Sequence, residues 1–202
     1  MNYKLDDLFV YGDTWAFTHI PKNAGANFKL RWRQQNNIHD DRNYTLEQRM
    51  LFHQPANWAR FNYPELTGKQ FIAITRNPYS RMLDWFIFIE HIHAWGWTKD
   101  PLAKSFEEFV KEDYLSKLSG FEQFAWKPQD PQVNWVEQNM KTFRMEDQLE
   151  ELEEYVQCKF KDTRFNSMNY GDWREYYTDD LRHFVWNRYS EDFIKFGYEK
   201  WT

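Results

Sequence analysis

The sequence has few of the residues that mark several classes of protein. It contains one cysteine, Cys158, so no disulfide can form within the chain. Its seven glycines and seven prolines form no repeat, low-complexity tract or flexible linker. The most apolar run, residues 85–89, is far shorter than the ~20 residues that a membrane span needs. We therefore expect a single domain, residues 1–202, with no membrane part and Cys158 as a small buried hydrophobe.

The chain also lacks a basic excess and an apolar N-terminal segment. It has 26 basic and 31 acidic residues, a formal net charge of -5. Nucleic-acid binders usually carry a basic stripe, so we expect no nucleic-acid partner. Residues 1–10 contain charged side chains and no signal-peptide core, so we expect a cytoplasmic protein. Aromatic residues are abundant at 20 %, which favours a well-packed globular domain.

Two short apolar runs, Trp15–Ile20 and Phe71–Thr75, are predicted to be buried strands. A helical pattern follows each run, over residues 27–35 and from Pro78 onward. Further expected elements are a helix capped by Ser105, a strand at 141–145, a helix at 146–157 and a helix from Thr178 to about Tyr189. This alternation predicts an α/β fold in which a parallel sheet is flanked by helices.

The first candidate site is the segment H-I-P-K-N-A-G-A-N at residues 19–27. A strand that turns into a helix presents backbone N–H groups at the positive end of the helix dipole, which favours an anion. Gly25 would let the backbone approach a ligand, and Lys22 supplies a cation. The alternative is an ordinary turn with a surface lysine. The segment is not a Walker A loop, which requires G-x-x-x-x-G-K-[ST].

The second candidate site is the segment T-R-N-P-Y-S-R at residues 75–81. Arg76 follows a predicted strand, and Ser80 and Arg81 lie in the first turns of the next helix. Ligands of open α/β sheets bind at the carboxyl ends of the strands. One guanidinium group can donate two parallel hydrogen bonds to the oxygens of a phosphate. The alternative is a salt bridge at the start of a helix.

Taken together, the H-I-P-K-x-A-G turn and the T-R-N-P-Y-S-R segment resemble the sulfotransferases that use 3′-phosphoadenosine 5′-phosphosulfate (PAPS). The similarity is greatest to the carbohydrate sulfotransferases and their soluble bacterial relatives. Less specific similarities are an F-x-x-F-V segment at 106–110, a P-Q turn at 128–129 or 131–132, and strand-end and closing patterns at 143–147 and 192–198. The resemblance implies a P-loop-like fold, a sulfuryl transfer from PAPS to a hydroxyl, and 3′-phosphoadenosine 5′-phosphate as the product, with no metal.

The resemblance also implies roles for individual residues. Lys22 matches the lysine that stabilises negative charge on the departing phosphate, and Arg76 matches the arginine that binds the 3′-phosphate. His53, in the segment L-F-H-Q-P-A, resembles a histidine that serves as the general base for the acceptor. The implied nucleotide-binding set is Lys22, Asn23, Ala24, Gly25, Ala26, Asn27, Arg76, Ser80 and Arg81.

The chain departs from the family pattern at both sites. Asn23, Ala26 and Asn27 stand where serine or threonine is usual, so hydroxyl contacts to the 5′-phosphate are lost or replaced by amides. Asp84 replaces a usual serine, and its carboxylate would repel a 3′-phosphate. Either Ser80 takes over together with Arg81, or Asp84 pairs with Arg81 and the 3′ site is weakened.

Several alternatives therefore stay open. One is a degenerate relative that binds the nucleotide without catalysis, and another is a nucleotide-dependent kinase, which the missing Walker residues disfavour. The resemblance favours a carbohydrate hydroxyl as the acceptor, while a small alcohol or a phenol remains an alternative. Four tryptophans are candidates for stacking on sugar rings: Trp58, Trp95, Trp97 and Trp126. The sequence leaves the oligomeric state open.

Overall fold

The computed structural model describes residues 4–38, 51–94, 96, 99, 102–112, 114, 127, 129–161 and 171–201. The chain packs into two compact units. The first comprises Met1–Thr75 and Gln132–Asn166, and the second comprises Arg76–Pro131 and Ser167–Thr202. No glycine- or serine-rich linker marks the passage from one unit to the other at residues 75–76 or 131–132, which explains why the sequence showed no boundary.

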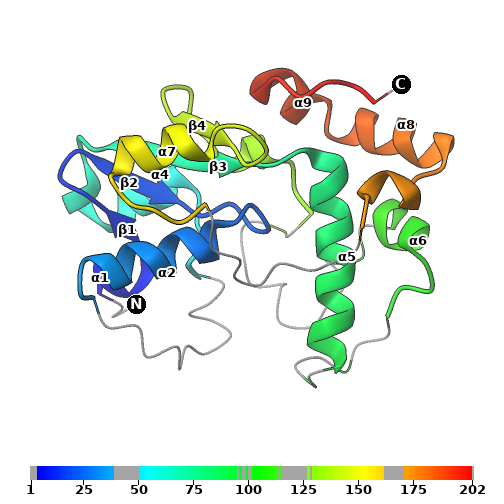
Figure 1. Ribbon diagram of the computed structural model, residues 1–202, viewed down its shortest axis with the longest axis horizontal. Coiled ribbons are helices and arrows are strands. Elements are labelled where there is room, and N and C mark those ends of the chain that lie inside the picture. Colours follow the sequence, from blue (N-terminus) through cyan, green and yellow to red (C-terminus); the bar gives the residue numbers. More distant parts are fainter. Residues whose placement is uncertain are drawn as a thin grey trace. The chain divides into compact units, whose positions relative to one another are not determined.

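The first unit contains an open sheet of four strands in the order β1-β2-β3-β4 (Figure 1). The strands are β1 (Val10–Tyr11), β2 (Trp15–Thr18), β3 (Gln70–Thr75) and β4 (Lys141–Arg144). β2, β3 and β4 are parallel, whereas β1 pairs antiparallel with β2. The predicted α/β fold with a mainly parallel sheet is thus confirmed, and the antiparallel edge strand is an addition to it.

Helices cover both faces of this sheet because successive strand residues point to opposite sides. Phe17 belongs to one hydrophobic cluster, to which α2 (Gly25–Gln35) and α7 (Leu149–Val156) contribute. Ala16, one residue earlier, belongs to another cluster, which includes residues of α4 (Ala56–Asn62). The shorter elements of this unit are α1 (Leu5–Leu8) and the 3-10 helices η1 (Pro64–Leu66) and η3 (Gln132–Trp135).

The second unit is helical in the part that the structure describes. Its elements are α5 (Pro78–Ala94), α6 (Phe106–Lys111), the 3-10 helix η4 (Trp173–Tyr176), α8 (Asp179–Arg188) and α9 (Ser190–Phe196). Its core is rich in aromatic rings, and the ring of Tyr79 stacks on that of Trp173 with centroids 5.5 Å apart. None of the described helices in either unit is long and apolar enough to cross a membrane.

The predicted helix starts are largely confirmed. Ser105 Oγ accepts a hydrogen bond from the amide of Glu108, and Thr178 Oγ1 accepts one from the amide of Leu181. The helix predicted from residue 146 begins instead at Leu149, because residues 145–147 form a turn. Cys158, predicted to be buried, is 1 % exposed, and burial raises its pKa to about 11.

Candidate functional site

The turn between β2 and α2 has an unusual backbone. Lys22 and Ala24 adopt φ angles of +70° and +59°, a left-handed conformation that costs about 1–3 kcal/mol for residues other than glycine. Ala24 is the N-cap residue of α2, and alanine has no side-chain oxygen to accept from the first amides of the helix. The start of this eleven-residue helix therefore depends on other acceptors, and an anion is a suitable one.

The side chain of Asn23 holds this turn in place. It is 1 % exposed, and its Nδ2 donates to the carbonyl of Ile74 at 2.9 Å and to Oε1 of Gln132 at 2.6 Å. Ile74 lies near the end of β3, so the turn is attached to the neighbouring parallel strand. Gln132 belongs to one of the two P-Q segments of the sequence. The Nδ2 donor of Asn23 is thus used inside the protein.

Asn27 is likewise engaged inside the first unit. Its Nδ2 donates to the carbonyl of Phe160 at 3.0 Å, and its backbone amide donates to the carbonyl of Ala24 at 3.0 Å. Asn27 thus has a structural role, and its contact with a phosphate stays a prediction. The backbone amides of Gly25 and Ala26 remain the candidates at the start of α2.

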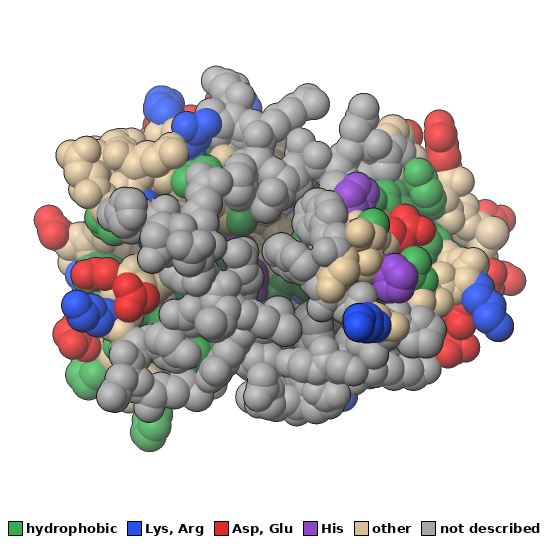
Figure 2. All heavy atoms as spheres, turned by 90° about the horizontal axis from the view of Figure 1, so that it is seen from below, with side chains coloured by type: hydrophobic (Ala, Val, Ile, Leu, Met, Phe, Trp, Pro, Cys, Tyr) green, Lys and Arg blue, Asp and Glu red, His purple; other side chains and the backbone are tan. Residues whose placement is uncertain are grey.

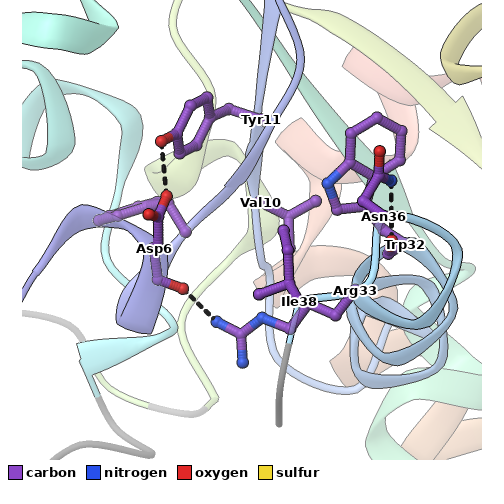
Figure 3. Close-up of a pocket in the computed structure, with 8 residues that line it drawn as sticks. Asp6, Val10, Tyr11, Trp32, Arg33, Asn36 and Ile38 are labelled. Atoms are coloured by element: carbon purple, nitrogen blue, oxygen red, sulfur yellow. Dashed lines mark hydrogen bonds between the residues drawn. The ribbon is translucent and has the colours of Figure 1, made fainter.

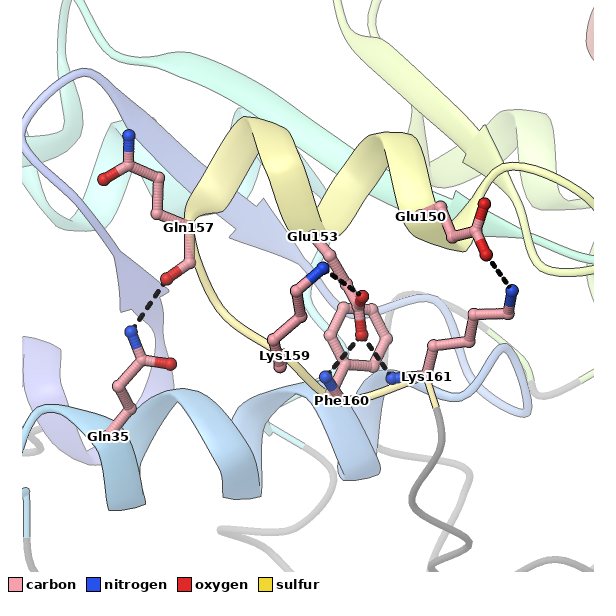
Figure 4. A network of polar contacts seen from close by, with 7 residues as sticks. All are labelled: Gln35, Glu150, Glu153, Gln157, Lys159, Phe160 and Lys161. Carbon is pink, nitrogen blue, oxygen red and sulfur yellow. Dashed lines mark hydrogen bonds and ion pairs between the residues drawn. The ribbon is translucent and has the colours of Figure 1, made fainter.

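The buried carboxylate of Glu153 fixes the segment to which Asn27 is hydrogen-bonded (Figure 4). Glu153 Oε1 accepts from the amides of Phe160 at 2.6 Å and Lys161 at 2.5 Å, and Glu153 Oε2 pairs with Lys159 Nζ at 3.2 Å. Burial alone would raise the pKa of Glu153, but the hydrogen bonds from Lys161 and Phe160 outweigh it and leave the pKa lowered. Glu153 thereby fixes the backbone of Phe160, whose carbonyl holds Asn27.

Gly25 is required for a reason that the sequence did not reveal. A Cβ atom at this position would lie 2.1 Å from Cδ2 and 2.5 Å from Nε2 of His19. The absent side chain therefore makes room for the His19 ring, and the predicted approach of a ligand is not needed to explain the glycine. His19 is 7 % exposed and was not among the predicted site residues, although it is the first residue of the motif.

His53 lies beside His19 in the same unit, with ring centroids 4.1 Å apart. His53 Nδ1 is 2.9 Å from the carbonyl oxygen of His19, and because a carbonyl can only accept, Nδ1 is the protonated nitrogen. In the neutral form of the ring, Nε2 then has the lone pair, which is the arrangement that a general base needs. Trp135 Nε1 donates to the carbonyl of His53 at 2.7 Å and fixes its backbone.

His19 itself is unsuited to proton transfer. Burial, followed by the charges of His53 and Lys29, lowers its pKa well below 6.5. His19 is therefore neutral at physiological pH. Within the described ranges, three buried atoms next to this turn have no hydrogen-bond partner: Thr18 Oγ1, His19 Nδ1 and Asn23 Oδ1. Buried polar atoms are rarely left in this state, so a water or a ligand hydroxyl is expected nearby.

In the second unit, Arg76 is held by two residues of α5. Its Nε donates to Ser80 Oγ at 3.1 Å, and its Nη1 lies 3.2 Å from Oδ2 of Asp84. The side chains of Arg76 and Asp84 are 10 % and 9 % exposed. Asp84 thus pairs with the arginine that was predicted to bind the 3′-phosphate.

Arg81 is 1 % exposed, and its Nη1 donates to the carbonyl of Asp130 at 2.9 Å. Burial lowers the pKa of this guanidinium, while the charge of Asp192 opposes the shift. This burial gives Arg81 a structural role in the second unit, and its contact with a 3′-phosphate stays a prediction.

The remaining predicted residues fall into three groups. Lys22 is partly exposed on the turn, as a ligand-binding lysine should be. Trp58 packs in the core against Phe9, with ring centroids 6.5 Å apart. Trp95, Trp97 and Trp126 lie outside the described residues.

One pocket of the first unit lies between α1, β1 and the last turns of α2 (Figure 3). Its volume of about 140 Å³ is below the 300–1,000 Å³ of typical ligand sites. Its polar groups already bond to one another, since Tyr11 Oη donates to Asp6 Oδ1 at 2.5 Å and Arg33 Nη2 donates to the carbonyl of Asp6 at 2.6 Å. This pocket is not the predicted nucleotide site.

Basic and acidic side chains are interspersed on the face that Figure 2 shows, in keeping with their near balance in the sequence. Among the described residues, no three His, Cys, Asp or Glu side chains gather where they could hold a metal ion. No protein-family model, no curated protein and no solved structure matches the chain, so the family resemblance depends on its sequence motifs alone.

Proposed function

We propose that the chain is a sulfotransferase that moves a sulfuryl group from PAPS to a hydroxyl, with a carbohydrate as the favoured acceptor. The observation that carries the proposal is the surroundings of the turn after β2. Lys22 and the start of α2 lie in the same unit as His53. The Nε2 atom of the neutral His53 ring has the lone pair that a base needs. Those are the parts that sulfuryl transfer to a hydroxyl requires.

The sheet gives this turn a suitable position. β2 and β3 are parallel neighbours, and the turn follows the carboxyl end of β2, where open α/β sheets bind ligands. On this basis we propose that the fold is P-loop-like, with residues 21–26 as the turn for the 5′-phosphosulfate. Arg76 and Ser80 are the residues that the family resemblance assigns to a 3′-phosphate.

Sulfuryl transfer resembles phosphoryl transfer, so positioning and charge stabilisation account for most of the rate. The acceptor oxygen forms a bond to sulfur while the bond from sulfur to the bridging oxygen breaks. His53 Nε2 takes the proton of the acceptor hydroxyl. Lys22 and the amides of Gly25 and Ala26 stabilise the negative charge that develops on the departing phosphate.

A second candidate is a nucleotide-binding protein without catalysis. The ion pair between Arg76 and Asp84 favours it, because the charge of this arginine is already balanced within the chain. A nucleotide-dependent kinase would instead bind ATP with magnesium, which gives a direct means of discrimination.

The test is transfer of radiolabelled sulfate from PAPS to an array of glycans and small alcohols. Wild type is expected to label an acceptor, Lys22→Ala to lose roughly 10²–10³ in kcat, and His53→Gln to lose a factor of similar size. Lys111→Ala is the matched control, since this lysine is 39 % exposed and pairs with Glu107 within α6, and it should keep the wild-type rate.

Calorimetry with 3′-phosphoadenosine 5′-phosphate, compared with ATP and magnesium, separates the alternatives. Binding of the bisphosphate without transfer to any acceptor supports the non-catalytic relative, and tighter binding of magnesium ATP supports a kinase. Wild-type turnover in both Lys22→Ala and His53→Gln with a confirmed acceptor would overturn the assigned roles.

A further inference from the structure

The ion pair of Arg76 and Asp84 resembles an anion-binding site in which the carboxylate of Asp84 takes the place of an external anion. Ser80 and Asp84 lie four residues apart on α5, so they face the same side on successive turns. Both contact the guanidinium of Arg76, Ser80 through Nε at 3.1 Å and Asp84 through Nη1 at 3.2 Å. A carboxylate and a phosphate present similar acceptor oxygens to an arginine. Asp84 thus occupies the position that an external anion would take.

Because the ion pair is buried, the charge of Asp84 has a strong effect on a nearby anion. The two side chains are 10 % and 9 % exposed, so water screens the charge of Asp84 only weakly. A negative group about 4 Å from this carboxylate, at an effective dielectric constant near 20, would be repelled by the equivalent of about 10³-fold in a dissociation constant for each unit charge. A 3′-phosphate on Arg76 must therefore displace Asp84 or accept this repulsion. Either cost offsets the attraction to Arg76.

We propose that Asp84 determines nucleotide specificity by making the chain nearly indifferent to a 3′-phosphate. This inference rests on the proposed function, because it concerns the nucleotide of that same site. The chain would bind adenosine 5′-monophosphate about as well as adenosine 3′,5′-bisphosphate. Adenosine 5′-phosphosulfate then becomes a donor of the same chemical class as PAPS: its sulfuryl group passes to the acceptor hydroxyl, His53 takes the proton, and adenosine 5′-monophosphate leaves.

The experiment measures the dissociation constants of adenosine 3′,5′-bisphosphate and adenosine 5′-monophosphate by calorimetry. In wild type, the bisphosphate should bind less than about 10-fold more tightly than the monophosphate. In Asp84→Asn, which keeps the size of the side chain and removes its charge, this preference should rise by about 10³-fold. Asp179→Asn is the matched control, because it removes a carboxylate that is 85 % exposed and paired with Arg182, and it should leave the preference unchanged.

Asp84→Asn removes one charge of a buried ion pair, so this variant is expected to be less stable than wild type. The wild-type preference needs no variant and tests the inference by itself. Thermal unfolding adds a second readout, since the bisphosphate should raise the Tm of Asp84→Asn more than the monophosphate does. In the double variant Arg76→Gln/Asp84→Asn the two nucleotides should bind equally, which shows that the effect passes through Arg76.

The outcomes separate this inference from the proposed function. A preference above about 10-fold in wild type, or one that Asp84→Asn leaves unchanged, overturns the role of Asp84 while nucleotide binding stands. If neither nucleotide binds wild type or Asp84→Asn, the proposed function and this inference are both overturned.

Discussion

Replacing Gly25 by alanine tests the contact on which the geometry of the first turn depends. The added Cβ would lie 2.1 Å from Cδ2 of His19, whereas ordinary contacts begin near 3.4 Å, so the ring must move by about 1.3 Å. His19 cannot move freely, because it is 7 % exposed and packs against His53 at 4.1 Å between ring centroids. The substitution therefore forces an extra methyl group into a filled space.

The magnitude follows from two opposing effects. Overpacking of this kind costs about 1–3 kcal/mol, while replacing glycine by alanine stabilises by about 0.4–1 kcal/mol through the unfolded chain. Gly25 has no positive φ, so this second effect applies to it. We expect a net loss of about 1–2 kcal/mol, which corresponds to a fall in Tm of roughly 2–8 °C for a chain of this size.

Urea unfolding followed by tryptophan fluorescence measures this loss, and a double-mutant cycle assigns it to His19. In a His19→Ala background the ring is absent, so Gly25→Ala should be neutral or stabilising. If Gly25→Ala were as stable as wild type, or equally destabilising with and without the His19 ring, the contact would not be the reason for the glycine.

Two further predictions concern pH and a buried carboxylate. The folded pKa of His19 lies below the unfolded value near 6.5, so the unfolded chain binds more protons than the folded chain. The free energy of unfolding should therefore fall as pH drops below about 6.5, by at most about 1.4 kcal/mol per pH unit. Urea unfolding from pH 7 to pH 5 should show this contribution lost in His19→Phe and kept in His183→Gln, an exposed control; the same slope in both would contradict it. Glu153→Gln should lower the free energy of unfolding at pH 7 by about 1–3 kcal/mol, because the amide of Phe160 then loses its bond to a carboxylate. Since the folded pKa of Glu153 is lowered, this difference should shrink as pH falls below about 4.5, and the half-exposed Glu151→Gln should cost less than about 0.5 kcal/mol; equal losses in the two variants would contradict the prediction.

The main elements of the fold were predictable because their burial extends over whole segments. All four residues of β2 and five of the six in β3 are buried, so their apolar runs are visible in the sequence. The periodic apolar residues of α5 likewise reveal a helix of seventeen residues. β1 escaped prediction because two residues are too few for a pattern, and its pairing depends on the turn that joins it to β2.

The two candidate turns were located correctly at strand ends, but the contacts within them were not predictable. The contact of Gly25 with His19 arises from left-handed backbone at Lys22 and Ala24, which neither residue type favours. The pairing of Arg76 with Asp84 spans eight residues and depends on how the chain enters α5. A sequence pattern shows which residues are close along the chain, whereas these contacts are determined by the local backbone geometry.

The attachment of Asn23 to β3 affects how any ligand would be bound. Immobilising the backbone of one residue takes about 1–2 kcal/mol of conformational entropy, and the bonds from Asn23 to Ile74 and Gln132 place that loss in the folding step. An anion would therefore bind to a turn whose backbone is already ordered before binding. Its affinity would then reflect the strength of its own contacts, with little subtracted for organising the protein around it.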